Sequence, residues 1–308
     1  MKLDFNKKIY GYSELFNFFI KLDVDKKIPN KFIISGKKGI GKSTFAYHLI
    51  NYLFSKNENN KYDINNFEVN EDNKSFKLVS NFTHPNFYLI DAIEGKERIS
   101  IESIRKSFNF INKSSINNDY RIILIDNMEY LNLNSSNALL KIIEEPNDKL
   151  IFILIHNSSY KLLDTINSRC IIFKKNITAH DTISIFEKLT DTPYKNVFND
   201  DLLVKYMTVE DLLFLKNLSE ENNLQEKISI NSLILFFFNT QKNKIEKKHY
   251  NIVVKLIQLY LYEKNLNYFD ENTYFWYKSF FTKLSNVKKY NLDIGNLFFE
   301  FRLNVFNE

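Results

Sequence analysis

The stretch that decides the fold is Gly36-Lys37-Lys38-Gly39-Ile40-Gly41-Lys42-Ser43. It follows the apolar run Phe32-Ile33-Ile34 and precedes Ser43 to Phe54, where apolar side chains recur at helical spacing. The order strand, glycine-rich loop and helix fits the pattern G-x4-G-K-[ST], and this context makes the match specific. Only six glycines occur in 308 residues, and three of them lie in this loop. The sequence therefore predicts a site for the phosphates of a nucleotide.

The residue types in this loop match the chemistry of phosphate binding. Glycines let successive backbone N–H groups converge on phosphate oxygens, and the following helix N-terminus adds partial positive charge. Lys42 is long enough to reach the terminal phosphates, and the Ser43 hydroxyl is suited to bind Mg²⁺. The candidate nucleotide-binding residues of the loop are Gly36, Gly39, Gly41, Lys42, Ser43 and Thr44. A glycine-rich turn without a ligand, or a phosphate loop kept only for structure, stays the alternative.

Further apolar runs are typical of buried strands, and helical patterns separate them. The strands are predicted at Phe87 to Ile90, Arg121 to Asp126, Leu150 to Ile155 and Cys170 to Phe173, with helices over Ile101 to Asn112 and over Ser135 to Glu145, which Pro146 ends. Continuous apolar strands alternating with helices predict an α/β fold with a parallel sheet covered on both faces. Residues Ser55 to Phe82, rich in Asn, Lys and Glu, are predicted to be mostly a solvated insertion.

Asp126 ends a predicted strand, where an aspartate can hold Mg²⁺ through water. ATPases of this type usually have a glutamate next, which polarises the attacking water, but here the next residue is Asn127, an amide that takes no proton. Glu129 lies two residues further on and is expected to leave the strand's end in a different direction. The sequence thus predicts that this chain binds a nucleotide and hydrolyses it poorly.

The strand signal disappears after Lys175. We predict an α/β nucleotide-binding domain over residues 1–175, a small helical lid over residues 176–222 and an all-α C-terminal domain over residues 223–308. The aromatic runs Phe236 to Phe238 and Tyr274 to Tyr277 are expected in the core or in a subunit interface rather than as platforms for stacking bases.

Composition limits the classes of function. The chain has 42 Lys and Arg against 37 Asp and Glu, a net charge of +5 that is far from a basic nucleic-acid tail. Cys170 is the only cysteine, so no internal disulfide or cysteine-based zinc site is predicted, and a reducing, cytoplasmic setting is favoured. No apolar run is long enough to span a bilayer, so we expect no membrane association. The lysines of Lys242 to Lys248 are expected in a solvated turn.

Three motifs together resemble the AAA+ subunits of the bacterial DNA polymerase III clamp loader. They are Ile123 to Asp126, Asn137 to Lys141 with Glu144-Glu145-Pro146, and Ser168-Arg169-Cys170, and their order and spacing cover about the first 175 residues. The segment Thr83 to Phe87, with Ile99 to Arg105, is also similar to the family's linker into its next strand and helix. Within this group, Asn127 is similar to the delta-prime subunits rather than to the ATP-hydrolysing gamma/tau subunits, which have glutamate there.

The resemblance implies a function in loading the sliding clamp onto primed DNA, within a DNA-directed DNA polymerase holoenzyme. By it, Arg169 is an arginine finger that completes a neighbouring subunit's ATP site, and Asn157 stands at the sensor-1 position. The implied cofactors are ATP and Mg²⁺. The implied partners are gamma/tau and delta subunits, with the sliding clamp and primer-template DNA contacted through the complex, and the C-terminal domain joins a pentameric collar.

Some features depart from the family, and alternatives stay open. Residues 55–82 lack the four cysteines of the family's zinc module, so no zinc is predicted, and the predicted lid lacks a Gly-x-x-Arg sensor-2 motif. The alternative function is an ATP-hydrolysing AAA+ motor of gamma/tau or recombination type, and a P-loop kinase is more distant. Without the resemblance, an arginine placed like Arg169 is more often a structural ion-pair partner.

Overall fold

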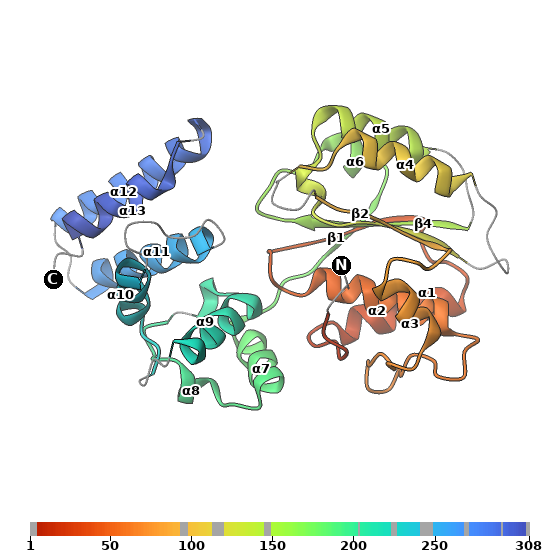
Figure 1. Ribbon diagram of the computed structural model, residues 1–308, viewed down its shortest axis with the longest axis horizontal. Helices are drawn as coiled ribbons and strands as arrows, with labels where there is room; N and C mark the ends of the chain where they lie inside the picture. Colours follow the sequence, from red (N-terminus) through yellow and green to blue (C-terminus); the bar gives the residue numbers. More distant parts are fainter. Residues whose placement is uncertain are drawn as a thin grey trace. The chain divides into compact units, whose positions relative to one another are not determined.

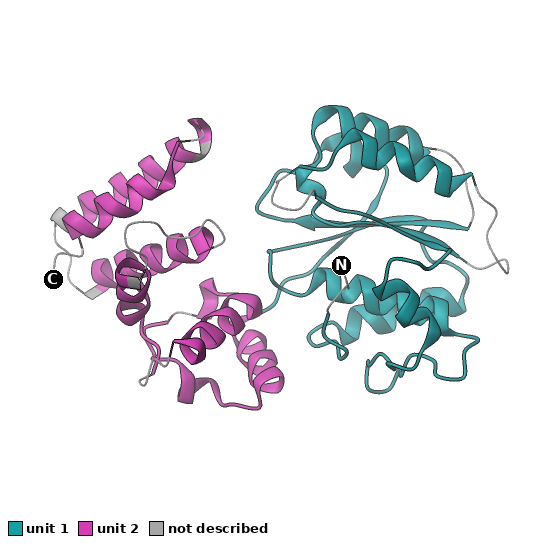
Figure 2. Ribbon diagram, in the orientation of Figure 1, with its two compact units in different colours: residues 1–177 teal, residues 178–308 magenta. Residues whose placement is uncertain are grey.

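The computed structural model divides the chain into two compact units, Met1–Ile177 and Thr178–Glu308 (Figure 2). The residues that it describes are 5–92, 98–112, 120–144, 149–202, 204–222, 227–240, 249–267, 271–290 and 292–305. The division of the second unit into a lid and a C-terminal domain at residue 222 stays a prediction.

The first unit is built on a five-stranded parallel sheet. Its strands are β1 (Lys31–Gly36), β2 (Phe87–Ile90), β3 (Arg121–Ile125), β4 (Leu150–Asn157) and β5 (Ile171–Lys174), in the order β2-β3-β4-β1-β5. Every residue of β3 and β4 is buried, which explains why these strands are continuous apolar runs. The predicted α/β fold class is confirmed.

Helices cover both faces of this sheet (Figure 1). On one face lie α1 (Ser13–Val24), α2 (Lys42–Ser55) and α3 (Lys74–Ser80); on the other lie α4 (Ile101–Ile111), α5 (Leu133–Glu144) and α6 (Asp164–Asn167). Alternate residues of each strand enter the two cores, so Ile122 and Leu124 face α1 and α2 while Ile123 and Ile125 face α4 and α5. Helix α1 was not predicted from the sequence. The predicted helix end at Pro146 lies outside the described residues.

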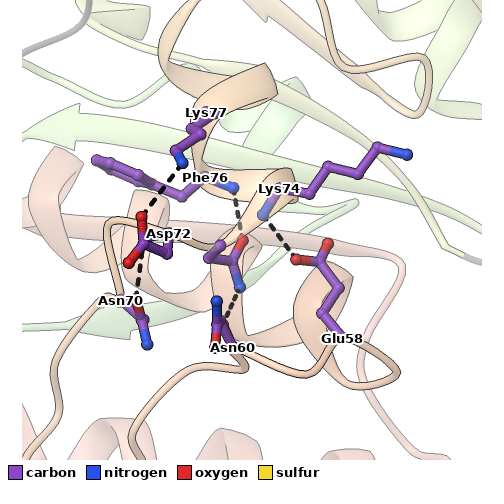
Figure 3. A network of polar contacts seen from close by, with 8 residues as sticks. Glu58, Asn60, Asn70, Asp72, Lys74, Phe76 and Lys77 are labelled. Carbon is purple, nitrogen blue, oxygen red and sulfur yellow. Dashed lines mark hydrogen bonds and ion pairs between the residues drawn. The ribbon is translucent and has the colours of Figure 1, made fainter.

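The segment that follows α2 is ordered by polar side chains that bond to backbone (Figure 3). The Glu58 carboxylate accepts the N–H groups of Lys74 (2.8 Å) and Ser75 (3.0 Å) at the start of α3. The Asn73 side chain accepts the Phe76 N–H at 2.7 Å and donates to the Asn60 carbonyl at 2.8 Å. These bonds satisfy backbone groups that a short helix leaves unpaired.

Apolar anchors tie the same segment to the core. Tyr62, Val69 and Val79 are at most 3% exposed and pack with residues of α1 and α2. Most of the segment is exposed, as predicted, but it is no loose insertion, because these anchors and helix α3 give it a fixed conformation.

Helices make up the regular structure of the second unit in its described residues, apart from an isolated bridge between Phe198 and Ile228. Its helices are α7 (Ala179–Thr190), α8 (Tyr194–Val197), α9 (Val209–Glu221), α10 (Ile230–Thr240), α11 (Tyr250–Asn267), α12 (Glu271–Tyr290) and α13 (Ile294–Val305). One hydrophobic cluster runs from Phe186 to Phe301, and the Lys255 ammonium on α11 bonds to Asp211 on α9 at 2.5 Å. The lysines of residues 242–248 lie outside the described part. None of the described helices has both the length and the hydropathy to cross a bilayer.

His48 gives the first unit a pH-dependent stability. Its ring is fully buried in α2 and bonds to the Tyr62 hydroxyl and to the Asn6 carbonyl, each at 2.8 Å. Burial lowers the pKa of His48 to about 4, although the Asn6 carbonyl favours the protonated form. An unfolded histidine has a pKa near 6.5, so between those values only the unfolded state gains the proton. The stability from neutral His48 is therefore full above pH ~6.5 and is lost as the pH falls towards ~4.

We expect the His48→Gln variant to depend less on pH than the wild type. Lowering the pH from 7.5 to 5 should cost the wild type about 2 kcal/mol of unfolding free energy through this one residue, and the variant should lack that loss. Urea unfolding followed by circular dichroism at the two pH values measures it. The variant His180→Gln, at an exposed position, is the control. Equal pH dependence of the His48 variant and the wild type would contradict the expectation.

Candidate nucleotide-binding site

The glycine-rich loop joins the end of β1 to the start of α2. Gly39 and Gly41 have φ angles of 79° and 83°, in the left-handed region that glycine adopts without strain. Because the first N–H groups of a helix have no intrahelical partner, the loop and the N-terminus of α2 are suited to bind an anion.

Gly36 is required by packing rather than by its backbone angles. A Cβ atom there would lie 2.5 Å from the Lys175 carbonyl oxygen and 2.6 Å from Cδ1 of Ile40. The first of these neighbours is backbone and has little freedom to move. The loop therefore starts at a point where only glycine fits.

Tyr12 supports the loop from the other side. It is 1% exposed, its hydroxyl donates to the Ile40 carbonyl at 3.1 Å, and its ring stacks on Phe45 with centroids 5.1 Å apart. The Lys175 ammonium lies 5.3 Å from the centre of the same ring. Tyr12 was not predicted from the sequence, because no motif marks a supporting residue that far before the loop.

Lys42 and Ser43 lie close to Asp126, which is distant from them in sequence. The Lys42 side chain is 7% exposed and donates to the Lys37 carbonyl at 2.6 Å. The Ser43 hydroxyl hydrogen-bonds to the Asp126 carboxylate across the carboxyl edge of the sheet. A hydroxyl and a carboxylate are oxygen ligands of the kind that Mg²⁺ prefers, so the residues present fit this ion.

The Asp126 carboxylate holds its proton more tightly than an ordinary aspartate. Burial and, to a smaller extent, the charge of Asp91 raise the pKa of Asp126 to about 6, against the lowering effects of Ser43, the Asn127 N–H and Lys42. A cation next to Asp126 would favour its charged form, so a proton and Mg²⁺ compete for this carboxylate.

The Asn127 side chain turns towards the outer strand of the sheet. Its backbone is left-handed, with φ 54°, and its N–H donates to Oδ1 of Asp126 at 2.8 Å. Its Nδ2 donates to Oδ1 of Asp91, directly after β2, also at 2.8 Å. The position next to Asp126 thus holds an amide that is bonded to another carboxylate.

The Glu129 side chain leaves the end of β3 in a different direction from that of Asn127. Its Oε2 accepts the N–H of Asn157, the last residue of β4, at 3.1 Å. The 3₁₀ turn Met128–Tyr130, which packs against β4, brings the side chain to this position at the C-terminal ends of the strands.

Asn157 lies beside the start of the phosphate loop. It pairs with Gly36 in the register of β1 and β4, and it is 8% exposed. Its Oδ1 accepts the Ser159 N–H at 3.1 Å, and the Ser158 N–H donates to the Gly36 carbonyl at 3.0 Å. The side-chain oxygen of Asn157 is therefore used within its own turn.

Arg169 lies near the N-terminal ends of the strands, whereas the loop lies at their C-terminal ends. It precedes β5, whose first residue Ile171 pairs with Phe32 near the start of β1, whereas the loop follows Gly36 at the end of β1. Four residue steps along a strand span about 13 Å. Arg169 is thus kept apart from the phosphate loop of its own chain, and it forms an ion pair with Glu144 at 2.7 Å.

The chain is similar in sequence to a known family and to several curated proteins. The family described as "DNA polymerase III, delta subunit" matches residues 11–177, more than half of the chain. DNA polymerase III subunit delta' of Pseudomonas aeruginosa is 27% identical over 140 residues, which are 46% of this chain and 41% of the relative. DNA polymerase III subunit gamma of Buchnera aphidicola (subspecies Schizaphis graminum) is 30% identical over 177 residues, 58% of this chain and 46% of the relative.

The aligned segments span less than half the length of these two curated relatives. Among solved structures, a DNA polymerase III gamma subunit-related protein of Thermotoga maritima has a TM-score of 0.48 and 17% sequence identity. That comparison covers 93% of this chain and 98% of the other.

The Tyr12→Phe variant should weaken nucleotide binding without unfolding the protein. The phenyl ring keeps the packing, but the Ile40 carbonyl loses its donor, at a cost of about 1 kcal/mol, or roughly fivefold in affinity. Titration with a fluorescent ATP analogue and Mg²⁺ measures the change, and the exposed Tyr290→Phe is the matched control. Unchanged affinity in a folded Tyr12→Phe variant would show that the hydroxyl does not support the loop.

Proposed function

Since this chain belongs to the DNA polymerase III delta-subunit family, we propose that it is a delta-prime-like subunit of a clamp loader. In this proposal it binds ATP with Mg²⁺, hydrolyses it poorly, and supplies Arg169 to the ATP site of a neighbouring subunit. Its partners are gamma/tau and delta subunits, and the complex contacts the sliding clamp and primer-template DNA. The named relatives, which include delta' and gamma subunits, support this assignment.

Nucleotide binding is supported by the intact loop and the residues around it. Lys42 would exchange the Lys37 carbonyl for the terminal phosphates, while Ser43 and Asp126 would hold Mg²⁺. Bound Mg²⁺ would neutralise part of the charge on the phosphates. Asn157, beside Gly36, would offer its side-chain amide hydrogens to the same phosphates, because its oxygen is already bonded.

One observation carries the prediction of poor hydrolysis, namely the Asn127 amide bonded to Asp91. Polarising an attacking water requires a group that accepts a proton, and an amide has negligible basicity. The bond to Asp91 also holds the side chain towards β2, an outer strand of the sheet that is separated from β1 by β3 and β4.

The role of Arg169 is supported by its position at the amino edge of the sheet. A guanidinium there is far from its own phosphate loop, but it is exposed to a neighbour whose carboxyl edge faces it. The C-terminal helices would join a collar, and the exposed rings of Tyr274 (51%) and Phe275 (63%) on α12 are candidates for that contact.

The second candidate function is an ATP-hydrolysing motor of gamma/tau or recombination type. It is favoured by Glu129, whose carboxylate lies at the end of β4 and could accept a proton if it released the Asn157 N–H. A gamma subunit among the relatives also fits this alternative.

The isolated protein should bind ATP with Mg²⁺ and turn it over negligibly. Lys42→Ala should abolish binding because the phosphates lose their charged donor, whereas Lys38→Ala, an exposed lysine of the same loop, should not. Isothermal titration and a steady-state phosphate-release assay measure the two properties. Robust turnover that disappears in Glu129→Gln would favour the motor instead.

The Arg169→Ala variant should assemble normally, but the complex that contains it should turn over ATP and load the clamp more slowly. Arginine fingers contribute roughly a thousandfold or more in other phosphate-loop systems, but the loss here should be smaller because other sites in the ring keep their own fingers. Arg169→Lys should rescue poorly, since an ammonium lacks the planar fork. ATP turnover and clamp loading by the reconstituted complex are the readouts, with Lys174→Ala, an exposed cation of β5, as control. Wild-type rates under limiting ATP would refute the finger.

A further inference from the structure

We propose that Glu144 is a positioning residue for Arg169, which holds the guanidinium in the orientation needed to reach a neighbour's phosphates. This inference rests on the proposed function of Arg169 as an arginine finger. It assigns a role to the last described residue of α5, which touches neither the phosphate loop nor Asp126.

The Arg169 guanidinium is held by three hydrogen bonds within its own chain. Its Nε donates to Oε1 of Glu144 at 2.7 Å. Its Nη1 donates to the Thr165 carbonyl and to the Ser168 hydroxyl, each at 3.0 Å. Among the described residues, no acceptor bonds to the second amino group, Nη2. Nε and Nη1 are thus held by the chain itself, and the N–H groups of Nη2 are left for an external anion.

Glu144 is attached to a rigid part of the unit. The two residues before it, Ile142 and Ile143, are at most 1% exposed and pack against β3 and β4. The Glu144 side chain itself is 53% exposed and that of Arg169 is 40% exposed. The Glu144 carboxylate therefore links the surface side chain of Arg169 to a helix that is anchored in the core.

This arrangement has little value for stability and more for orientation. Exposed ion pairs contribute about 0–1 kcal/mol to folding, because water screens the charges and two long side chains lose freedom. A free arginine must lose that freedom when it binds a phosphate, whereas one that is already held loses less. Since Glu144 bonds to Nε, it orients the guanidinium while the N–H groups of Nη2 stay open.

The experiment compares two substitutions of Glu144 in the reconstituted complex. Glu144→Ala removes the acceptor and should lower the kcat for ATP by roughly threefold to tenfold, with KM for ATP unchanged within about twofold. Glu144→Gln keeps an oxygen acceptor of the same reach and should retain most of the turnover, which a purely electrostatic role of Glu144 would not allow. The control is Asp164→Asn on α6, which removes the carboxylate of an exposed ion pair with Lys161.

The outcomes separate this inference from the function on which it rests. If Arg169→Ala leaves turnover unchanged, the finger itself is wrong and this inference falls with it. If Arg169→Ala lowers turnover but Glu144→Ala does not, only the positioning role is wrong. A higher kcat in Glu144→Ala would also overturn it, because the carboxylate would then restrain the finger. Loss of assembly in Glu144→Ala, seen by co-purification, would make Glu144 an interface residue and overturn the proposal as well.

Discussion

The parallel register of β1, β3 and β4 is the constraint on which the rest of the first unit depends. Because all three strands run the same way, the chain leaves each of them at one edge of the sheet. The phosphate loop, Asp126 and Asn157 lie at or directly after the ends of these strands and so converge without being near in sequence. The same polarity sends the segment before β5 to the other edge, together with Arg169. The common direction of the strands thus brings the phosphate loop, Asp126 and Asn157 together and keeps Arg169 away from them.

The parts that could be predicted from the sequence are those in which one local signal dominates. Buried strands such as β3 and β4 are continuous apolar runs, and the loop pattern fixes Lys42 and Ser43 at a helix N-terminus. The position of Asp126 followed from the end of its strand. These signals are strong because burial on both faces leaves few residue types that fit.

Other parts depend on contacts that no local pattern encodes. Glu129 reaches Asn157 only because a 3₁₀ turn changes the direction of the chain, and such a turn has no marker in this stretch. Tyr12 acts through a bond to Ile40 from the position just before α1. In the sequence, the segment after α2 cannot be told from a solvated loop, because Glu58 and Asn73 are common surface residues. Only the structure shows that their side chains bond to the start of α3 and order the segment (Figure 3).

The separation of Arg169 from its own phosphate loop gives the first unit a head and a tail. An assembly in which each unit gave this arginine to one neighbour and received one from another would be heterologous, with each interface asymmetric, and it would either close into a ring or end. In an assembly that ends, one terminal subunit has a phosphate loop that no neighbour completes. Under the proposed function, a subunit in that position would not need a base next to Asp126, where this chain has the Asn127 amide.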